Sequence, residues 1–332
     1  MRHDTVQLAK MLSIVIPVFR NEKNIDRLVQ ELERIAGIAT MPIEAVLVVD
    51  GSPDRSLESL RERLPSAKYS SRLVSLSRNF GAFNAVRCGL EQATGDYLAV
   101  LAADLQEPAD LALTFLDILK RDEADIVFAT RSSRDDPWFD EITSDAFWSL
   151  YRRWVLPEVP RGGVNAVGCT REVCDRLLEL REPTTNLIAL FFWLGFRRAY
   201  VPYHREARRD GRSAWTLGKK LRYGLDSLFS FTDLPVRLLL MLGVVGTLTA
   251  VVFAVLLLSA SLAGQITVPG YAPTVLVVTF FGSITSLGLG ILGQYVWLIL
   301  QTTRGRPAYL VDGVERFESA RARPPVGIPS AR

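Results

Sequence analysis

The chain has 332 residues, of which 23% are charged, and its formal net charge at pH 7 is +3. This composition is typical of a folded protein rather than a disordered one, and the small net charge argues against a nucleic-acid partner. The cysteines Cys88, Cys169 and Cys174 are odd in number and lack a metal-type spacing with the two histidines. A disulfide framework and a zinc site are therefore not expected, and we interpret the three side chains as reduced core thiols.

Short apolar runs alternate with segments of helical periodicity after an N-terminal extension, residues 1–10, that lacks an apolar stretch of signal-peptide length. This alternation favours an α/β fold with a mostly parallel sheet and helices on both faces. The predicted strands are Leu12–Val18, Ile43–Val49, Leu73–Leu76, Tyr97–Ala102 and Asp125–Ala129, and the predicted helices are Asn24–Ile35, Leu57–Leu64, Phe83–Gln92 and Leu111–Leu119.

Polar residues follow the predicted strands at their carboxyl ends, where open parallel sheets bind ligands. Asp104 comes directly after a buried apolar run, and we expect it to hold a divalent metal or a ligand hydroxyl. Asp50 follows the second strand and could accept hydrogen bonds from a base or a ribose. An Asp in that position is also common as a helix cap or turn residue, so both roles stay open.

Two segments beyond Arg131 mix cationic residues with others suited to a membrane surface. Residues 138–154 combine aromatic side chains with Arg152 and Arg153, which is typical of a membrane interface but also of an ordinary helix packed on the sheet. Residues 205–222 carry seven cationic side chains against Glu206 and Asp210. Juxtamembrane clusters of this kind attract anionic headgroups.

The stretch from Leu238 to Thr303 contains no Asp, Glu, Lys or Arg. Its two apolar runs, about residues 235–262 and 273–300, each exceed the roughly 20 residues needed to cross a bilayer, and they predict a transmembrane hairpin. Cationic residues flank only its outer ends, so the positive-inside rule places the rest of the chain in the cytoplasm. The alternative is a buried core hairpin of a soluble protein. The proline-containing tail after Phe317 is expected to be partly disordered.

Four motifs in fixed order resemble the family-2 glycosyltransferases, and most closely the polyprenyl-phosphate type, relatives of dolichol-phosphate mannose synthase and the bacterial undecaprenyl-phosphate glucosyltransferases. The motifs are Ile16–Glu22, Val49–Asp54, Leu76–Gly81 and Asp104–Pro108, and Trp193–Phe196, Gly211–Trp215 and the two apolar runs continue the match. The resemblance covers residues 11 to 310. It implies an A-type glycosyltransferase fold, which is Rossmann-like, followed by the membrane hairpin.

The resemblance also implies that a UDP- or GDP-sugar binds across the strand ends and that Asp104 with Gln106 holds Mg²⁺ or Mn²⁺ on its diphosphate. The implied nucleotide-sugar contacts are Pro17, Phe19, Glu22, Asp50, Ser52, Arg78, Asn79, Ala103, Asp104 and Ser213. The implied catalytic residues are Asp104, Asn165, Arg205 and Arg212, and the implied lipid-phosphate contacts are Arg205, Arg208, Arg209 and Lys219. A headgroup contact or a solvated surface charge is an equally open role for any one of these arginines.

Three positions depart from the family pattern, because Val49, Ala102 and Asn165 stand where relatives commonly have Asp. Asn165 cannot act as a general base, and a sugar-hydroxyl acceptor would then lose about 10²- to 10⁴-fold in rate. A polyprenyl phosphate, with a second pKa near about 6, arrives already ionised. The substitution therefore favours a phosphate acceptor.

The sequence predicts an inverting, metal-dependent hexosyltransferase that acts on a polyprenyl phosphate at the cytoplasmic face of the cell membrane, as a multi-pass protein and, by analogy with relatives, a homotetramer. The alternatives are a family-2 transferase with a glycan acceptor and a non-catalytic scaffold of a glycan-assembly complex. The predicted organisation is an extension (1–10), a cytosolic nucleotide-sugar-binding domain (11–204), a basic loop and juxtamembrane amphipathic segment (205–233), the hairpin (234–303) and a cytosolic tail (304–332).

Overall fold

A computed structural model of the chain describes residues 10–131, 158–160, 164–180, 187–204, 234–263 and 270–319. These residues belong to two compact units, which we describe separately. The first unit contains the described residues up to 204 and those from 307 onward, and the second contains residues 234–263 and 270–306.

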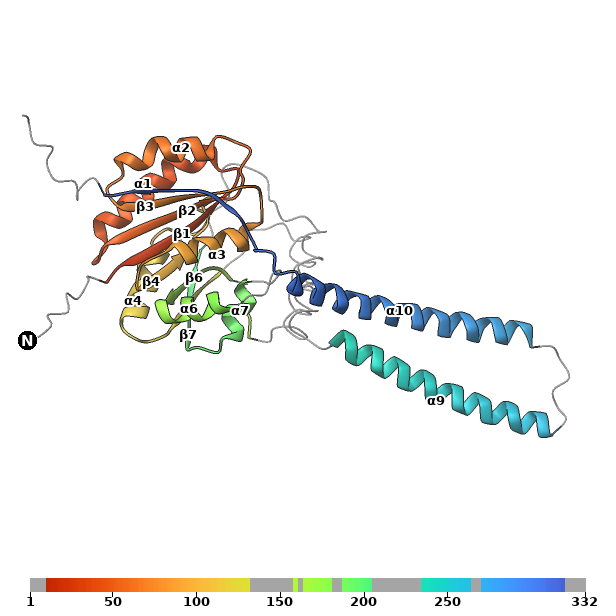
Figure 1. The fold of residues 1–332 in the computed structure, drawn as a ribbon. Coiled ribbons are helices and arrows are strands. Elements are labelled where there is room, and N and C mark those ends of the chain that lie inside the picture. Colours follow the sequence, from red (N-terminus) through yellow and green to blue (C-terminus); the bar gives the residue numbers. More distant parts are fainter. Residues whose placement is uncertain are drawn as a thin grey trace, which may run out of the picture. The chain divides into compact units, whose positions relative to one another are not determined.

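The first unit is built on a mixed sheet whose described strands have the order β7-β5-β6-β4-β1-β2-β3-β8 (Figure 1). The strands β4, β1, β2 and β3 are parallel neighbours, whereas β6 is antiparallel to β4 and β5, and β8 is antiparallel to β3. Their bounds are Leu12–Val18 (β1), Ile43–Val49 (β2), Ser70–Leu76 (β3), Tyr97–Val100 (β4), Ile126–Arg131 (β5), Val164–Thr170 (β6), Arg198–Tyr203 (β7) and Val311–Phe317 (β8).

Helices cover both faces of this sheet. Ile14 and Ile16 of β1 belong to one core cluster with Leu28 of α1 and Phe115 of α4, while Val15 of β1 faces the opposite side and meets α3. The helices of this unit are α1 (Ile25–Ile38), α2 (Ser56–Arg63), α3 (Ala82–Gln92), α4 (Leu111–Lys120), α6 (Arg171–Glu179) and α7 (Leu187–Trp193), with short 3-10 turns at Glu22–Asn24 and Leu64–Ser66. Burial on both faces explains why the central strands are continuous apolar runs.

A buried carboxylate links three elements at the amino-terminal edge of the sheet. Glu44 of β2 is 5% exposed, and its Oε2 accepts hydrogen bonds from Ser13 Oγ (2.7 Å) and from Thr94 N and Oγ1 (2.9 and 3.0 Å). Its Oε1 lies 2.9 Å from Arg72 Nε of β3. A charge can be buried in this way only because it is paired and fully hydrogen-bonded.

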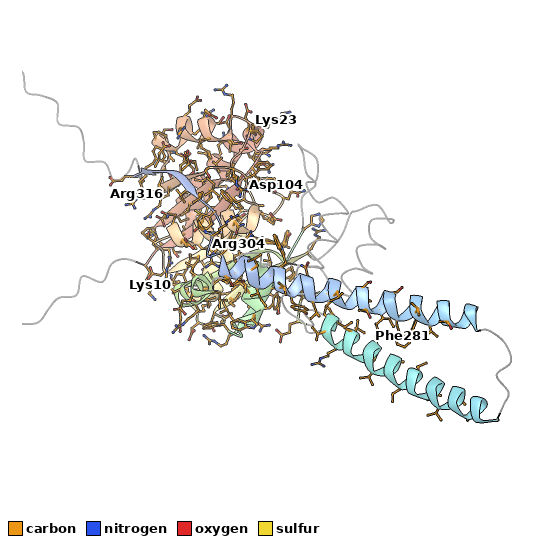
Figure 2. All side chains as sticks on the ribbon, turned by 45° about the vertical axis from the view of Figure 1, so that its right-hand side comes forward. Lys10, Lys23, Asp104, Phe281, Arg304 and Arg316 are labelled. Atoms are coloured by element: carbon orange, nitrogen blue, oxygen red, sulfur yellow. The ribbon has the colours of Figure 1, made fainter. Side chains whose placement is uncertain are left out.

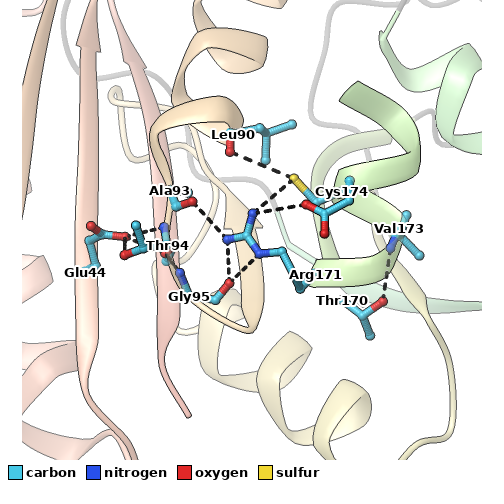
Figure 3. Close-up of polar contacts among 11 residues, drawn as sticks. Glu44, Leu90, Ala93, Thr94, Gly95, Thr170, Arg171, Val173 and Cys174 are labelled. Carbon is cyan, nitrogen blue, oxygen red and sulfur yellow. Dashed lines mark hydrogen bonds and ion pairs between the residues drawn. The ribbon is translucent and has the colours of Figure 1, made fainter. Parts of the chain in front are cut away.

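Arg171, the first residue of α6, holds the connection between α3 and β4 (Figure 3). Its guanidinium donates to the carbonyl oxygens of Gly95 (Nε, 2.9 Å) and Ala93 (Nη2, 3.0 Å) and lies 3.6 Å from Asp175. These carbonyls directly follow the end of α3, where a cation is favoured by the helix dipole. Arg171 therefore fastens α6 near the start of β4, at the edge of the sheet opposite the predicted ligand edge.

The three cysteines are buried free thiols, as the sequence predicts. Burial raises the pKa of Cys88 and of Cys174 to about 12, so both are protonated and unreactive at neutral pH.

The second unit contains two long helices, α9 (Leu234–Leu262) and α10 (Tyr271–Thr303). Among the described residues, one stretch, Phe280–Leu300 of α10, is long and apolar enough to cross a membrane. The apolar stretch of α9, Pro235–Gly246, is shorter. Phe281 approaches Gly246 and Leu239 approaches Gly288, so the two helices contact each other at glycines. A hairpin that spans the membrane twice remains a proposal.

The predicted strands and helices of the first unit are confirmed, with shifts at their ends. β1 and β2 have the predicted bounds, whereas β3 begins at Ser70 and β4 ends at Val100. The sequence did not predict β6, α6, α7 or β7. It also did not predict β8, which lies in the segment expected to be a tail and instead extends the sheet beside β3. The aromatic segment 138–154, the basic segment 205–222 and the prolines beyond 319 lie outside the described residues.

Candidate active site

The carboxyl ends of β1, β2, β3 and β4 lie at one edge of the sheet, because these neighbouring strands are parallel. The loops that follow them are residues 19–24, 50–55, 77–81 and 101–110. Figure 2 shows Asp104, on the last of these loops, and Lys23, on the first, on the side of this unit opposite Lys10 and Arg316. The topology thus brings to one edge those predicted donor-binding residues that the structure describes.

The start of β6 reaches the same edge, because β6 runs antiparallel to β4. Val167 pairs with Val100, the last residue of β4, so Asn165 lies beyond that pair on the side of the Asp104 loop. The backbone therefore brings positions 104 and 165 to one edge. The side-chain placement of Asn165 lies outside the description.

The loops after β1 and β2 are tied together by Asp54. Its Oδ1 accepts hydrogen bonds from the hydroxyls of Ser52 (2.6 Å) and Ser56 (2.7 Å), and its Oδ2 accepts from the amide of Glu22 (3.1 Å). Ser52 Oγ also accepts from the amide of Arg20 (2.8 Å). Burial raises the pKa of Asp54, but these hydrogen bonds outweigh it and hold that pKa below its ordinary value.

Two of the predicted donor contacts in these loops have backbone-bracing roles. The hydroxyl of Ser52 donates a hydrogen bond to Asp54, and the carboxylate of Glu22 accepts one from the backbone amide of Arg55 (3.2 Å). Phe19, by contrast, is 37% exposed and has an open ring beside Arg20, whose guanidinium lies 5.4 Å from the ring centre. Pro17 is half-buried within β1. Phe19 therefore offers an exposed aromatic surface to a ligand.

Asp50 braces the loop that follows β3. Its carboxylate accepts from the amides of Phe80 (Oδ1, 2.7 Å) and Gly81 (Oδ2, 2.8 Å), and the residue is 2% exposed. Burial raises the pKa of Asp50 above its ordinary value, although the two amides and Arg78 oppose this. Asp50 thus braces a loop some 30 residues away, which is neither the local cap or turn role nor the base contact that the sequence suggested. The base contact of Asp50 stays a prediction.

The same loop approaches the Asp50 turn very closely. Gly51 has φ +54°, and a Cβ atom on it would lie 2.2 Å from the carbonyl carbon of Arg78. Asn79 Nδ2 donates to the carbonyl of Asp50 (3.3 Å), and the exposed guanidinium of Arg78 lies 4.1 Å from the ring centre of Phe80. Only glycine fits at position 51, and it allows the two loops to form one surface.

Asp104 lies half-buried on the loop after β4, and its Oδ1 accepts from the amide of Gln106 at 3.4 Å. Ala103 and Gln106 are buried at 2% and 7% exposure, and Leu105 between them has φ +52°, a left-handed backbone that is costly for a leucine. Strain of this kind concentrates at functional sites.

The donor set at Asp104 fits a cation held mainly by its substrate. No group of three or more His, Cys, Asp or Glu side chains that could hold a metal occurs in the part of the chain that the structure describes. Mg²⁺ is commonly bound by one or two carboxylates together with substrate phosphates, so a single carboxylate at position 104 is compatible with such a site. Metal binding by Asp104 and the side chain of Gln106 stays a prediction.

Comparison with known proteins identifies the family. The family model described as glycosyl transferase family 2 matches residues 13–178. An uncharacterized glycosyltransferase of Synechocystis sp. is 32% identical over 92% of this chain and 96% of its own length. The chain belongs to glycosyl transferase family 2. It is a glycosyltransferase, and the family predicted from the four motifs is confirmed.

Two further relatives of this family-2 chain are named for their acceptors. The undecaprenyl-phosphate 4-deoxy-4-formamido-L-arabinose transferase of Yersinia enterocolitica is 29% identical over 93% of this chain and 96% of its own length. A prophage bactoprenol glucosyl transferase homolog of Escherichia coli is 26% identical over 92% of this chain and 99% of its own length.

Solved structures support the fold of the family-2 domain. Glucosyl-3-phosphoglycerate synthase of Mycobacterium tuberculosis, in complex with Mn²⁺ and UDP-glucose, superposes with a TM-score of 0.50 at 19% identity and covers 67% of this chain and 78% of its own. The predicted α/β glycosyltransferase fold with a mostly parallel sheet is confirmed by this likeness.

Some of the predicted site residues of this glycosyltransferase lie outside the described residues, namely Arg205, Arg208, Arg209, Arg212, Ser213 and Lys219. Sequence reasoning also missed two contacts at the ligand edge. Tyr203 Oη donates to Glu107 on the Asp104 loop at 3.5 Å, and Leu310 contacts the loop after β3. The missed strand β8 has its apolar residues Val311, Val314 and Phe317 three positions apart, which gives no strand-like alternation.

Proposed function

We propose that this glycosyltransferase transfers a hexose from a UDP- or GDP-sugar to a polyprenyl phosphate, with inversion and with a divalent cation. The observation that carries the proposal is the placement of Asp104 beyond β4, at the edge where the loops after β1, β2 and β3 also lie. The names of two relatives, which act on undecaprenyl phosphate or bactoprenol, support the acceptor.

The donor would lie across the strand ends. Phe19 presents an exposed ring on which a base can stack, and Arg78 presents a guanidinium that can pair with a phosphate or a base edge. Asp104 and Gln106 would hold Mg²⁺ or Mn²⁺ against the diphosphate. When bound, the cation neutralises the negative charge that develops on the departing diphosphate.

The acceptor needs no base at position 165. An ionised phosphate oxygen uses its own electron pair to attack the anomeric carbon, and the bond from that carbon to the diphosphate oxygen breaks on the opposite side. No proton is removed in this step, so Asn165 can orient the phosphate by hydrogen bonding without repelling it. Arg205, Arg208, Arg209, Arg212 and Lys219 are proposed phosphate contacts, and Ser213 a donor contact, on the basis of the family resemblance alone.

The proposal includes a location at the cytoplasmic face of the cell membrane. α10 contains a stretch that could cross a bilayer. α9, whose apolar sequence continues to Leu262, would be the second span of a hairpin. Arg237, Arg304 and Arg306 flank the outer ends of the two helices, as the positive-inside rule requires for a cytoplasmic site. A homotetramer is proposed by analogy with relatives.

The experiment is to incubate the purified full-length protein with Mn²⁺ or Mg²⁺, a panel of UDP- and GDP-sugars and undecaprenyl phosphate, and to detect glycolipid by mass spectrometry. Asp104→Asn should lower turnover by about 10²-fold or more, because the cation loses its carboxylate. Asp117→Asn, an exposed residue of α4, is the matched control and should leave turnover unchanged. Absence of glycolipid from every donor would refute the proposal.

A scaffold without catalysis is the second candidate, and the missing acids favour it. By the family resemblance, Ala102 stands where relatives commonly have Asp. The scaffold predicts donor binding that is unchanged in Asp104→Asn and no glycolipid from the wild-type protein. A transferase with a glycan acceptor predicts turnover with an oligosaccharide and none with undecaprenyl phosphate.

A further inference from the structure

The chain returns to the sheet directly after α10. Only residues 304–308 separate Thr303, the end of α10, from Tyr309, and residues 311–317 then form β8 beside β3. The two strands are antiparallel from Ser71, opposite Phe317, to Leu76, opposite Val311. Without β8, β3 would be the edge strand of this sheet.

This returning segment contacts the loop that carries Arg78 and Asn79. The register shifts between Ser75 and Leu76, and beyond this irregularity the carbonyl of Leu310 accepts a hydrogen bond from the amide of Ser77 (3.0 Å). Ser77 is the first residue of the loop. Bulges of this kind re-aim a strand end and are common beside active sites.

The loop is therefore held at both ends. Asp50 binds the amides of Phe80 and Gly81 at its far end, and Leu310 binds the amide of Ser77 at its near end. Between the two contacts lie the exposed residues Arg78 and Asn79, and Asn79 Nδ2 donates to the carbonyl of Asp50 (3.3 Å).

Side chains of residues 309–317 also contact two helices, α2 and α3. Glu315 pairs with Arg61 of α2 (Oε1 to Nε, 2.6 Å), and Tyr309 donates a hydrogen bond to Glu91 of α3. Gly313 lies so close to β3 that a Cβ on it would stand 3.2 Å from Ser75 Oγ. The position of Leu310 thus depends on how well β8 is seated.

We propose that residues 309–317 are a positioning element of the donor site, which sets the loop 77–81 in the conformation that binds the nucleotide. The inference rests on the proposed function, because it takes Arg78 and Asn79 to be donor contacts. A loop fixed before binding loses less conformational freedom on binding, so seating β8 raises the affinity for the nucleotide without touching it.

The first test replaces Gly313 by Val, whose Cβ would crowd Ser75 Oγ at 3.2 Å, and compares it with Val314→Thr, a same-shape change at an exposed position of the same strand. The probe is UDP with Mn²⁺, titrated by calorimetry into the full-length protein. Gly313→Val should weaken UDP binding about tenfold, equivalent to about 1.4 kcal/mol, with the KM for undecaprenyl phosphate unchanged, and Val314→Thr should bind like wild type.

The second test asks for rescue. Glu315→Arg places two cations together and should weaken UDP binding about threefold, while the double variant Arg61→Glu with Glu315→Arg should restore it. Thermal unfolding of each variant shows whether it is folded. Equal UDP affinity in wild type, Gly313→Val and Glu315→Arg would overturn the positioning role alone. A wild-type protein that binds neither UDP nor GDP overturns the proposed function, and this inference with it.

Discussion

Replacing Glu44 by Ala should be among the most destabilising single changes in the first unit. The substitution leaves Ser13 Oγ, Thr94 N and Thr94 Oγ1 without the oxygen they share, at distances now between 2.7 and 3.0 Å. It also leaves the guanidinium of Arg72, whose side chain is only 16% exposed, without its carboxylate. Removing one member of a buried ion pair costs about 3–5 kcal/mol, and we expect a loss in that range.

The assay is thermal unfolding of the full-length protein in detergent, followed by intrinsic fluorescence. For a unit of this size a loss of 3–5 kcal/mol corresponds to roughly 6–20 °C in Tm. Glu44→Gln keeps an acceptor oxygen but points amide hydrogens at Arg72, so its Tm should fall between those of Glu44→Ala and wild type. Glu58→Ala, an exposed residue of α2, should stay within about 0.5 kcal/mol of wild type. A Glu44→Ala protein within about 1 kcal/mol of wild type would refute the reasoning.

Three further changes test the loops and the helix packing. Gly51→Ala should weaken UDP binding about tenfold or more by calorimetry, because its Cβ would collide with the backbone of Arg78 at 2.2 Å; unchanged affinity would contradict the close approach. The pKa of Asp54 is held below its ordinary value, so its stabilising effect is present above pH 3.8 and is lost as the pH falls through the folded-state pKa. The Tm difference between wild type and Asp54→Asn should therefore be largest near neutral pH and shrink below about pH 4, and a difference that grows with acid would refute this sign. Arg171→Ala should lower stability by about 2–3 kcal/mol in thermal unfolding, because charged hydrogen bonds to two carbonyls are lost, and Arg171→Lys should recover part of it.

The strands that lead to the site could be predicted because nearly every residue along them is buried, so that each strand is a run of consecutive apolar residues. β1 and β2 are covered on both faces, so each is a continuous apolar run that ends at turn residues, and the predicted bounds are those of the structure. The same reasoning places Asp104 at the ligand edge, since a parallel strand must deliver its following residue there.

The role of Asp50 could not be predicted in the same way. Its carboxylate binds the amides of residues 80 and 81, and no local pattern specifies which backbone lies opposite a side chain some 30 positions away. β8 is a second example of a long-range contact. It is half-exposed and lies at the edge of the sheet, so its sequence carries neither the continuous apolar run of a central strand nor a regular alternation.

Three acids that the family resemblance leads us to expect at this edge are absent, which has an electrostatic consequence for the proposed acceptor. Two unit charges 4 Å apart repel by about 4 kcal/mol at an effective dielectric constant of about 20, and by about half of that at twice the distance. By the family resemblance, Val49, Ala102 and Asn165 stand where a carboxylate is expected, and the carboxylate of Asp50 accepts hydrogen bonds from two backbone amides. A phosphate dianion approaching Asp104 would therefore meet less repulsion than it would in an acid-rich site, whereas a neutral hydroxyl would gain nothing from this loss and would miss a base. Restoring the acid by Asn165→Asp should then raise the KM for undecaprenyl phosphate; a rise in kcat by orders of magnitude instead would show that the acceptor needs a base and would refute the phosphate argument.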